Sequence, residues 1–277
     1  MRREHTGPEF RGKASPTMPS SIATTLISAA RAGADVLRSY FARSLVPGVM
    51  QKGPADFVSE ADLQSETVIR RVLGAAYPDV RFQAEETDVD RASTGPRFII
   101  DPLDGTTNFL REIPHFSISL AYADDTGTVA GVVLDPMRDE LFWAERGVGA
   151  FLGERRLRVS SLTSLEAALI HTGIPHRGAA DHARYLSRLS RVMASVVGIR
   201  RMGSAALDLS YVAAGRGDAF FERGLKPWDL AAGMLLVCEA GGVVTDQDGG
   251  ERMVERGEVL AASSALHALV LRTLNGP

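Results

Sequence analysis

The sequence predicts an α+β protein with two β-sheets and covering helices, and three patterns carry this prediction. Residues 20–44 and 60–76 repeat apolar side chains at helical spacing. Short apolar segments separated by turn residues follow them. From about residue 168, strand-like and helical segments alternate, which is typical of a sheet with helices on both faces. We therefore expect a mostly antiparallel sheet in the first half and a second, smaller sheet in the second half.

The elements of the first half follow from apolar periodicity and turn residues. A first helix is expected over 20–44 with Ser20 or Ser21 as its cap, and a loop over 46–56 leads to a second helix over 60–76. Asp124 to Gly127 is typical of a hairpin turn, and Pro136 lies in the next turn. Strands are expected over 80–83, 97–100, 116–123, 129–134 and 140–144.

The second half is expected to alternate between short strands and longer helices. Strands are predicted over 168–172, 196–200, 218–221 and 259–261. Helices are predicted over 180–194, 204–214 and 229–240, with a final helix through Leu274. The resulting division is a disordered N-terminal extension over 1–19, an α+β subdomain over 20–155 and an α/β subdomain over 156–277.

Composition narrows the class of partner. The net charge of −3 gives no support for a nucleic-acid or anionic-membrane partner, and no apolar stretch is long enough to span a bilayer. Residues 1–17 lack the apolar core of a secretory signal, so the cytoplasm is the expected compartment. Cys238 cannot form an internal disulfide and is expected to be a small core residue. His115, His171 and His176 show no metal-ligand spacing and are interpreted as structural or surface residues.

The segment Asp101–Phe109 carries most of the functional signal. It follows an apolar run over 98–100 that is typical of a buried strand; Pro102 keeps Asp101 out of helical geometry, and Gly105 permits a tight turn. Two carboxylates therefore project from a strand end beside the N–H groups of a helix start. This arrangement offers oxygen ligands for a hard divalent cation and donors for phosphate. The alternative is a strand-to-helix loop with solvated Asp caps.

Two further acidic positions have a structural and a functional interpretation. Glu85 and Glu86 follow a short apolar strand; they are either surface residues, or Glu85 completes a cation site with Asp101 from a neighbouring strand. Asp229 begins a helical run and is either its N-cap or a carboxylate for a second metal.

Two loops are also candidates for ligand contact. Lys52, Asp56 and Asp62 belong either to a mobile polar loop and a capped helix, or to a lid whose Asp62 orients a hydroxyl or a water. The arginines at 200–201 precede a helix start at 203–205, which either presents backbone groups to a polar ligand or is a routine turn.

Two motifs identify the chain as similar to a known family. Asp101–Phe109 resembles the metal-binding signature of the inositol monophosphatase family, and Trp228–Gly233 resembles its second signature. The similarity runs from about Ile22 to Leu269, with the Glu85–Glu86 pair shortly before the first motif. Ala84 and Ser59 replace the Gly and Thr that are common in the family, and neither change removes a ligand.

The resemblance implies a role for each matched residue. Glu85, Asp101 and the carbonyl of Leu103 would hold a first Mg²⁺, and Asp101, Asp104 and Asp229 a second, with a weaker third near Glu85. Thr106 and Asp62 would orient the attacking water. The implied substrate contacts are Asp104, Gly105, Thr106, Gly203, Ala205 and Glu222, of which Glu222 accepts hydroxyls, and Lys52 fits the mobile loop.

The implied fold is a layered α-β-α-β-α sandwich, and the implied activity is Mg²⁺-dependent hydrolysis of a small polyol phosphate, foremost inositol monophosphate. A homodimer and inhibition by lithium are further implications. Fructose 1,6-bisphosphate, histidinol phosphate and a nucleotide 3′-phosphate remain rival substrates. A regulatory or RNA-associated role through the dimer is the rival of another class, although the acidic balance argues against direct RNA binding.

Overall fold

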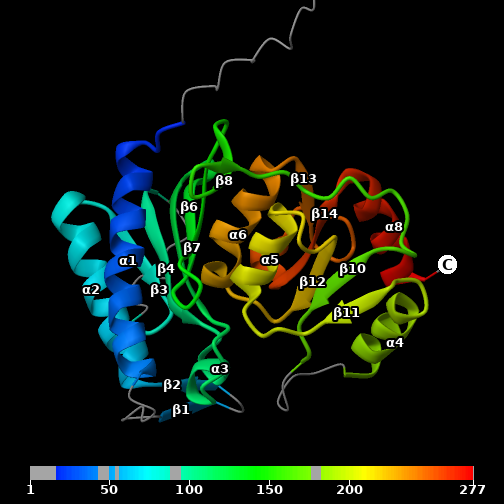
Figure 1. Cartoon of the computed structure of the whole chain (residues 1–277), viewed down its shortest axis with the longest axis horizontal. Helices are drawn as coiled ribbons and strands as arrows, with labels where there is room; N and C mark the ends of the chain where they lie inside the picture. The colour runs from blue at the N-terminus through cyan, green and yellow to red at the C-terminus, as the bar shows by residue number, and fades with distance from the viewer. Residues whose placement is uncertain (1–16, 43–49, 54–55, 88–94, 176–181, 277) are drawn as a thin grey trace, which may run out of the picture.

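The computed structural model describes residues 17–42, 50–53, 56–87, 95–175 and 182–276. Helices and sheets alternate in layers across the molecule, α-β-α-β-α (Figure 1). The outer layer at one side is formed by α1 (Ser21–Phe41) and α2 (Glu60–Ala76), which cover the larger sheet. The predicted layered sandwich is confirmed.

Within the described residues, the larger sheet has seven strands in the order of the chain. β3 and β4 are parallel, and every later neighbour pair in this sheet is antiparallel, as predicted for the first half. The strands are β3 (Arg81–Ala84), β4 (Arg97–Asp104), β5 (Ser117–Asp124), β6 (Gly127–Asp135), β7 (Glu140–Glu145), β8 (Gly149–Leu152) and β9 (Arg155–Arg156).

The smaller sheet has five strands in the described part of the chain, in the order β11-β10-β12-β14-β13. β10 is parallel to β11 and β12, and β14 is antiparallel to β12 and β13. Their bounds are β10 (Leu169–Thr172), β11 (Gly198–Arg200), β12 (Ala219–Arg223), β13 (Gly242–Thr245) and β14 (Glu258–Ser263). The helices of this half are α4 (His182–Met193), α5 (Ala205–Ala213), α6 (Pro227–Glu239), α7 (Met253–Arg256) and α8 (Ser264–Asn275).

The middle helix layer joins the two sheets. Helices α5 and α6 share one apolar core with strands of both sheets, whereas α4 and α8 cover the far face of the smaller sheet. The approach is close because two glycines leave room: a Cβ at Gly131 of β6 would lie 2.9 Å from the Cα of Ala232, and one at Gly233 would lie 2.6 Å from the Leu209 side chain. Such close packing fixes the start of α6 against the larger sheet.

The structure corrects several predicted elements. Part of the expected loop over 46–56 is strand: β1 (Met50–Gly53) pairs antiparallel with β2 (Asp56–Val58). Strands β8, β9 and β13 and helix α7 were not predicted, because their short segments lack a clear apolar period. The first strand with candidate ligands does not end at residue 100 but continues through the motif to Asp104.

Three further predictions concern Cys238, the division at residue 155 and the N-terminal extension. Cys238 is exposed rather than a core residue, because it lies at the end of α6 on a turn that points away from the packed face. The division at residue 155 lies inside β9, and the two subdomains stay a prediction. The expected disorder of 1–19 falls mainly outside the described residues, although Ser20 caps α1 by accepting from the amide of Ala23.

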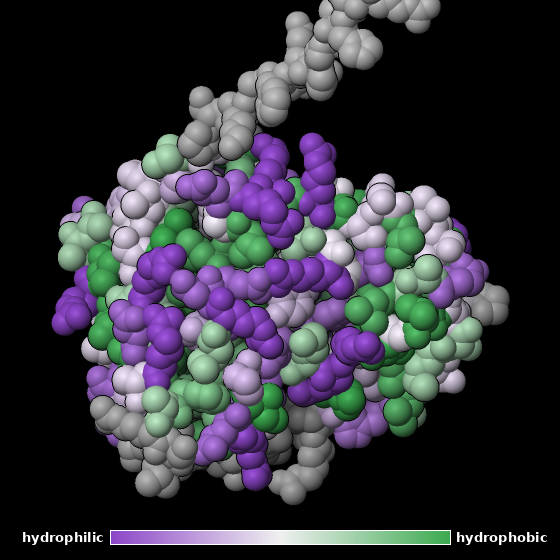
Figure 2. Space-filling view, viewed as in Figure 1, coloured by the Kyte–Doolittle hydropathy of each residue, from purple (hydrophilic) through white to green (hydrophobic). Residues whose placement is uncertain are grey.

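Exposed apolar side chains gather over α4 and beside the edge strand β11 (Figure 2). Figure 2 shows charged side chains across the middle of this face and apolar ones gathered over α4. The exposed apolar side chains there include Leu186, Met193 and Val197, with exposed fractions of 60%, 61% and 69%. No helix among the described residues is both long and apolar enough to cross a membrane.

Candidate active site

An irregularity in β4 aims the first two acidic residues. Asp101 lies opposite Ser119 of β5 and Asp104 lies opposite Ser117, and the register shifts between these two pairs. A bulge of this kind redirects side chains at a strand end. Pro102 lies inside the bulge, where its missing N–H costs no ladder bond. The turn then continues through Gly105 into the short helix α3 (Thr106–Leu110).

Three carboxylates converge at this strand end. Asp101, Asp104 and Asp229 each place one carboxylate oxygen within 4.8 Å of the others. Asp101 and Asp104 are buried, and Asp229 is half-buried at the start of α6. A cluster made entirely of carboxylate oxygens is the donor set of a hard divalent cation such as Mg²⁺. The residues present therefore fit a metal of this kind.

Burial and repulsion between the carboxylates raise the pKa values of the cluster. Burial raises the pKa of Asp101 well above its usual range, and Glu85, Asp104 and Asp229 raise it further. Burial likewise raises the pKa of Asp104 to about 6, and burial with the charge of Asp104 raises that of Asp229 to about 7. A bound cation would relieve this repulsion by neutralising the cluster.

Asp104 is held by the start of α5. Its Oδ2 accepts from the Ser204 hydroxyl at 2.6 Å and from the amide of Ala206 at 2.8 Å. Ser204 is also the N-cap of α5, since its side chain accepts from Leu207. The predicted helix start at 203–205 thus faces the cluster, and Ser204 is a contributor that the sequence analysis missed.

Asp229 lies at the third position of α6 rather than at its cap. The helix begins two residues earlier than predicted, at Pro227, because the fixed φ of proline suits the first helical position. The Asp229 Oδ2 accepts from the amide of Lys226 at 2.7 Å. The Ser119 hydroxyl donates to the Trp228 carbonyl at 2.9 Å and ties this helix start to β5. The carboxylate therefore serves the helix terminus and the cluster together.

Glu85 follows β3 and lies close enough to Asp101 for its charge to raise the pKa of that carboxyl. Its amide donates to the Ile100 carbonyl at 3.1 Å. The loop is anchored by Glu66, a buried residue of α2 whose Oε2 accepts from the amide of Glu86 at 3.0 Å and whose Oε1 accepts from the Thr87 hydroxyl. The sequence analysis missed Glu66; a glutamate on the apolar face of a predicted helix was the available signal.

Thr106 and Asp62 come together as expected. The Thr106 hydroxyl lies 3.3 Å from the Asp62 Oδ1 and 3.1 Å from the Leu103 carbonyl. The other Asp62 oxygen, Oδ2, accepts from the amide of Ser59 at 2.9 Å and from its hydroxyl at 2.5 Å. Asp62 is thus fixed by its own helix start and keeps one oxygen directed at Thr106.

The remaining predicted residues lie around the same cluster. The Glu222 carboxylate is close enough to Asp208, Asp229 and Asp104 for their charges to raise its pKa, after burial itself. A Cβ at Gly105 would lie 3.1 Å from the Gly203 carbonyl, so these two turns touch. The amide of Ala205 lowers the pKa of Asp104 by hydrogen bonding. Lys52 lies in β1, but its side chain is outside the described residues, as is His176.

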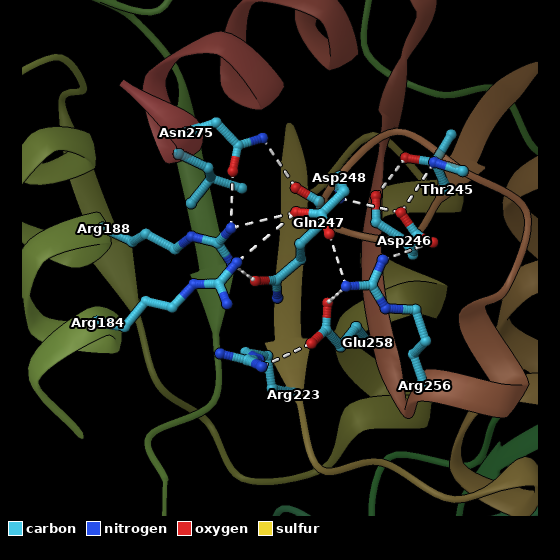
Figure 3. Close-up of polar contacts among 12 residues, drawn as sticks. Arg184, Arg188, Arg223, Thr245, Asp246, Gln247, Asp248, Arg256, Glu258 and Asn275 are labelled. Atoms are coloured by element: carbon cyan, nitrogen blue, oxygen red, sulfur yellow. Dashed lines mark hydrogen bonds and ion pairs between the residues drawn. The ribbon is translucent and has the colours of Figure 1, made fainter. Parts of the chain in front are cut away.

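A polar network at the end of the smaller sheet supports the strand that carries Glu222. The Gln247 side chain donates to the Glu222 carbonyl at 2.8 Å and accepts from Arg188 at 2.6 Å. Figure 3 shows that Arg188 also reaches Asn275 at the end of α8, and that Arg223 pairs with Glu258. These contacts connect β12 to α4 and α8 of the outer helix layer and to the neighbouring strand β14, so the backbone at Glu222 is held from that layer and from within its own sheet.

Replacing Gly105 by alanine is expected to damage both the fold and the site. Its φ is +100°, and a Cβ would meet the carbonyls of Gly203 and His115 at 3.1 and 3.2 Å. Backbone strain and overpacking together predict a loss of about 3 kcal/mol in the free energy of unfolding. Turnover should fall with it, because Asp104 and Thr106 flank the turn. Urea unfolding and a phosphate-release assay measure the two effects.

Gly147→Ala is the matched control for Gly105→Ala. Gly147 has a φ of +77°, but a Cβ there would meet no atom within 4 Å. We expect this control to lose about 1 kcal/mol from backbone strain and to keep its turnover. Equal losses in the two variants would contradict the close approach at Gly105.

Comparisons with known proteins agree with this geometry. The inositol monophosphatase family matches residues 18–276, and the chain belongs to this family. It is therefore a phosphoric monoester hydrolase of a metal-dependent family. It is 50% identical over 230 residues to an inositol-1-monophosphatase of Rhizobium meliloti (strain 1021), covering 83% of this chain and 86% of the relative. It is also 43% identical over 253 residues to the Nus factor SuhB of Pseudomonas aeruginosa, covering 90% and 93%.

Solved structures extend the likeness to the whole fold. The crystal structure of the extragenic suppressor protein SuhB from Bartonella henselae is 45% identical, with a TM-score of 0.88 over 92% of this chain and 98% of that one. The inositol monophosphatase of Thermotoga maritima is 36% identical, with a TM-score of 0.82 over 90% and 94%. The predicted family is confirmed.

Proposed function

We propose that this phosphatase is Mg²⁺-dependent and hydrolyses inositol monophosphate to inositol and phosphate. The observation that carries this proposal is the convergence of Asp101, Asp104 and Asp229. Glu222 lies close enough for the charges of Asp229 and Asp104 to raise its pKa. An acidic cation site beside an acceptor for alcohol hydroxyls suits the phosphate ester of a polyol. Family membership and the names of its relatives support the same substrate class.

The proposed ligands of the cation are Asp101, Asp104, Asp229, Glu85 and the carbonyl of Leu103. Bound there, Mg²⁺ supplies positive charge that neutralises the phosphate and makes a nearby water more acidic. Asp101 is the central member, because its pKa responds to all three other carboxylates. The number of ions, two or three, is an expectation from the family resemblance, as is inhibition by lithium.

Thr106 and Asp62 are proposed to hold the attacking water. The Thr106 hydroxyl has two acceptors in reach, the Leu103 carbonyl and the Asp62 Oδ1; with the Leu103 carbonyl given to the cation, its hydrogen is donated to Asp62. Its oxygen lone pairs can then accept a hydrogen from a water on the other side. Ser59 fixes Asp62 through its second oxygen, so the pair is oriented before substrate arrives. Phosphoryl transfer gains chiefly from such positioning and from charge neutralisation.

The other end of the site is proposed to select the substrate alcohol. Glu222 would accept hydrogens from ring hydroxyls, and the backbone at Gly203 and Ala205 lies beside Asp104 and Gly105 to contact the same group. Gly105 and Thr106 would contact the phosphate. The rival substrates named above use the same ligands and differ in the group that Glu222 meets.

A substrate panel tests the proposal. With Mg²⁺, the purified chain is expected to hydrolyse inositol 1-phosphate with a kcat/KM at least about tenfold above those for fructose 1,6-bisphosphate, histidinol phosphate and a nucleotide 3′-phosphate. EDTA is expected to abolish phosphate release, and excess Mg²⁺ to restore it. A leading kcat/KM for another member of the panel would replace the substrate but keep the class of reaction.

A regulatory role is the second candidate, because several relatives at 41–43% identity are Nus factors named SuhB. Co-purification from cells with and without nuclease separates it from catalysis: an RNA-dependent partner would be lost on nuclease treatment.

We also propose a cytoplasmic homodimer, for which the exposed apolar side chains over α4 and β11 offer a surface. Sedimentation equilibrium measures the mass directly.

A further inference from the structure

A buried histidine–aspartate pair lies beside the substrate end of the site. His171 of β10 places its Nδ1 2.6 Å from the Oδ1 of Asp208, which belongs to α5. Their side chains are 3% and 1% exposed. Neither residue was assigned a function by the sequence, since 37 positions separate them and His171 has no metal-ligand spacing. The pair needs an explanation, because a buried carboxylate is costly unless it is hydrogen-bonded.

The surroundings of His171 fix its orientation. Its ring packs edge-on against Tyr211, with centroids 6.1 Å apart, and lies against Gly217, where a Cβ would be 2.7 Å from the Nε2. The Nε2 is buried and has no hydrogen-bond partner among the described residues. The ring hydrogen is therefore best placed on Nδ1, from which it donates to Asp208. The ring fills the space that a side chain at position 217 would need.

The end of β10 also supports Glu222 directly. Gly173 lies two residues after His171, and a Cβ on it would be 1.7 Å from the Oε1 of Glu222, so the carboxylate occupies the space that a side chain would need. Between them, the Thr172 hydroxyl donates to the Phe221 carbonyl at 2.8 Å. One strand end therefore contacts Glu222 with its backbone and holds Asp208 with its histidine.

Charges from several elements face Glu222. After burial, Asp208 is the leading cause of its raised pKa; Arg201 acts in the opposite sense, and Asp229 and Asp104 raise the pKa further. Tyr185 of α4 is also near, because Glu222 contributes to the raised pKa of its hydroxyl. On the other side, His171 faces Tyr211 and lies near His115, whose pKa it helps to lower. Of the carboxylates that raise the pKa of Glu222, Asp208 has the largest effect, and it is the one that the His171 ring holds.

We propose that His171 and Asp208 position Glu222. His171 holds the Asp208 carboxylate beside Glu222, and this arrangement sets how well Glu222 accepts hydroxyls of a polyol phosphate. This inference rests on the proposed function of Glu222. His171 and Asp208 are positioning residues and touch neither phosphate nor water in this scheme. The expected signature is a change in the binding of the alcohol portion with little change in the chemical step.

Four variants test the pair with inositol 1-phosphate and with p-nitrophenyl phosphate, which lacks alcohol hydroxyls. His171→Ala frees Asp208 and is expected to raise the KM for inositol 1-phosphate about tenfold with kcat nearly unchanged. His171→Asn places an amide donor near the Nδ1 position and should keep KM within about threefold of wild type. Asp208→Asn removes a negative charge beside Glu222 and should raise the KM for inositol 1-phosphate about threefold, with little change in the KM for p-nitrophenyl phosphate. His267→Ala, the control, removes a buried histidine that contacts Thr245 of the edge strand β13 and, among the described residues, no charged group of the site.

The outcomes separate this proposal from a structural role and from the proposed function. Wild-type KM values in His171→Ala and Asp208→Asn, with only lower melting temperatures, would overturn it. An equal rise of KM for p-nitrophenyl phosphate would also overturn it. If His171→Ala does not fold, Asp208→Asn decides through its KM for inositol 1-phosphate compared with its KM for p-nitrophenyl phosphate. Glu222→Gln tests the underlying function: an unchanged KM there removes the role of Glu222 itself, whereas a raised KM there with a silent His171→Ala removes the pair alone.

Discussion

Replacing Asp101 by asparagine is expected to lower turnover by at least about 10³-fold while the protein stays folded. Asp101 is the carboxylate that Glu85, Asp104 and Asp229 all face. Asparagine keeps the acceptor for the amide of Leu103, which lies 3.0 Å from the Asp101 Oδ1. The local backbone is therefore preserved, and the loss falls on the charge that binds the cation. Asp229→Asn is expected to behave in the same way.

Although Asp101→Asn is expected to lose turnover, it is expected to gain thermal stability when no metal is bound. The pKa of Asp101 is raised in the folded chain, so its ionised form is the less favourable one at pH 8. In EDTA at that pH, Asp101→Asn is expected to raise the melting temperature by roughly 2–8 °C. Calorimetry measures this shift, and a phosphate-release assay with Mg²⁺ measures turnover.

Asp135→Asn is the control for Asp101→Asn. Asp135 is also buried, but its carboxylate pairs with Arg138 at 2.8 Å and accepts from the amides of Met137 and Arg138. Losing it should lower the melting temperature and leave kcat within a few-fold. A lower melting temperature in both variants, or wild-type turnover in Asp101→Asn, would remove Asp101 from the metal site.

Much of the site could be predicted because most of its candidate ligands lie in short segments with recognisable turn and helix-start residues. A Pro, a Gly and two aspartates within Asp101–Gly105 specify a strand end that turns sharply, and Asp229 lies just inside a helix that begins with Pro227. Helical and apolar periods also predicted the two-sheet architecture. Local patterns of this kind survive folding, because the same residues that carry the chemistry determine the backbone.

The parts that escaped prediction depend on contacts between distant segments. The helix start at 203–205 offered only backbone groups or a routine turn to sequence reasoning, and the Ser204 side chain gained a role only where α5 lies beside Asp104, 100 residues earlier in the chain. His171 and Asp208 become partners only through the packing of β10 against α5. The edge strands β9 and β13 have few buried residues, so alternation did not reveal them. Cys238 followed an apolar run, yet the packed face of α6 turns away from it.

Binding of Mg²⁺ is expected to depend steeply on pH, because it must displace protons from the cluster. In the unliganded chain the pKa of Asp229 is raised to about 7 by burial and by Asp104, and that of Asp104 to about 6 by burial. The ligands bind Mg²⁺ as ionised carboxylates, so the affinity for Mg²⁺ should fall as the pH is lowered from 8 to 6. Below the pKa of a ligand, each pH unit should weaken binding about tenfold for each proton that must be released. Titration calorimetry in two buffers of different ionisation enthalpy measures both the affinity and the protons released.

The stability of the folded chain should depend on pH through the same two carboxylates. A raised pKa in the folded state means that protonation of Asp104 and Asp229 stabilises the chain fully below their unfolded values, and that this stability is lost as the pH rises toward 7. Mg²⁺ replaces the lost protons, so it should raise the melting temperature more at pH 8 than at pH 6. Asp229→Asn removes one titrating ligand and should release fewer protons on binding. Equal Mg²⁺ affinity at pH 6 and pH 8, with no proton release, would show that these carboxylates do not receive the cation.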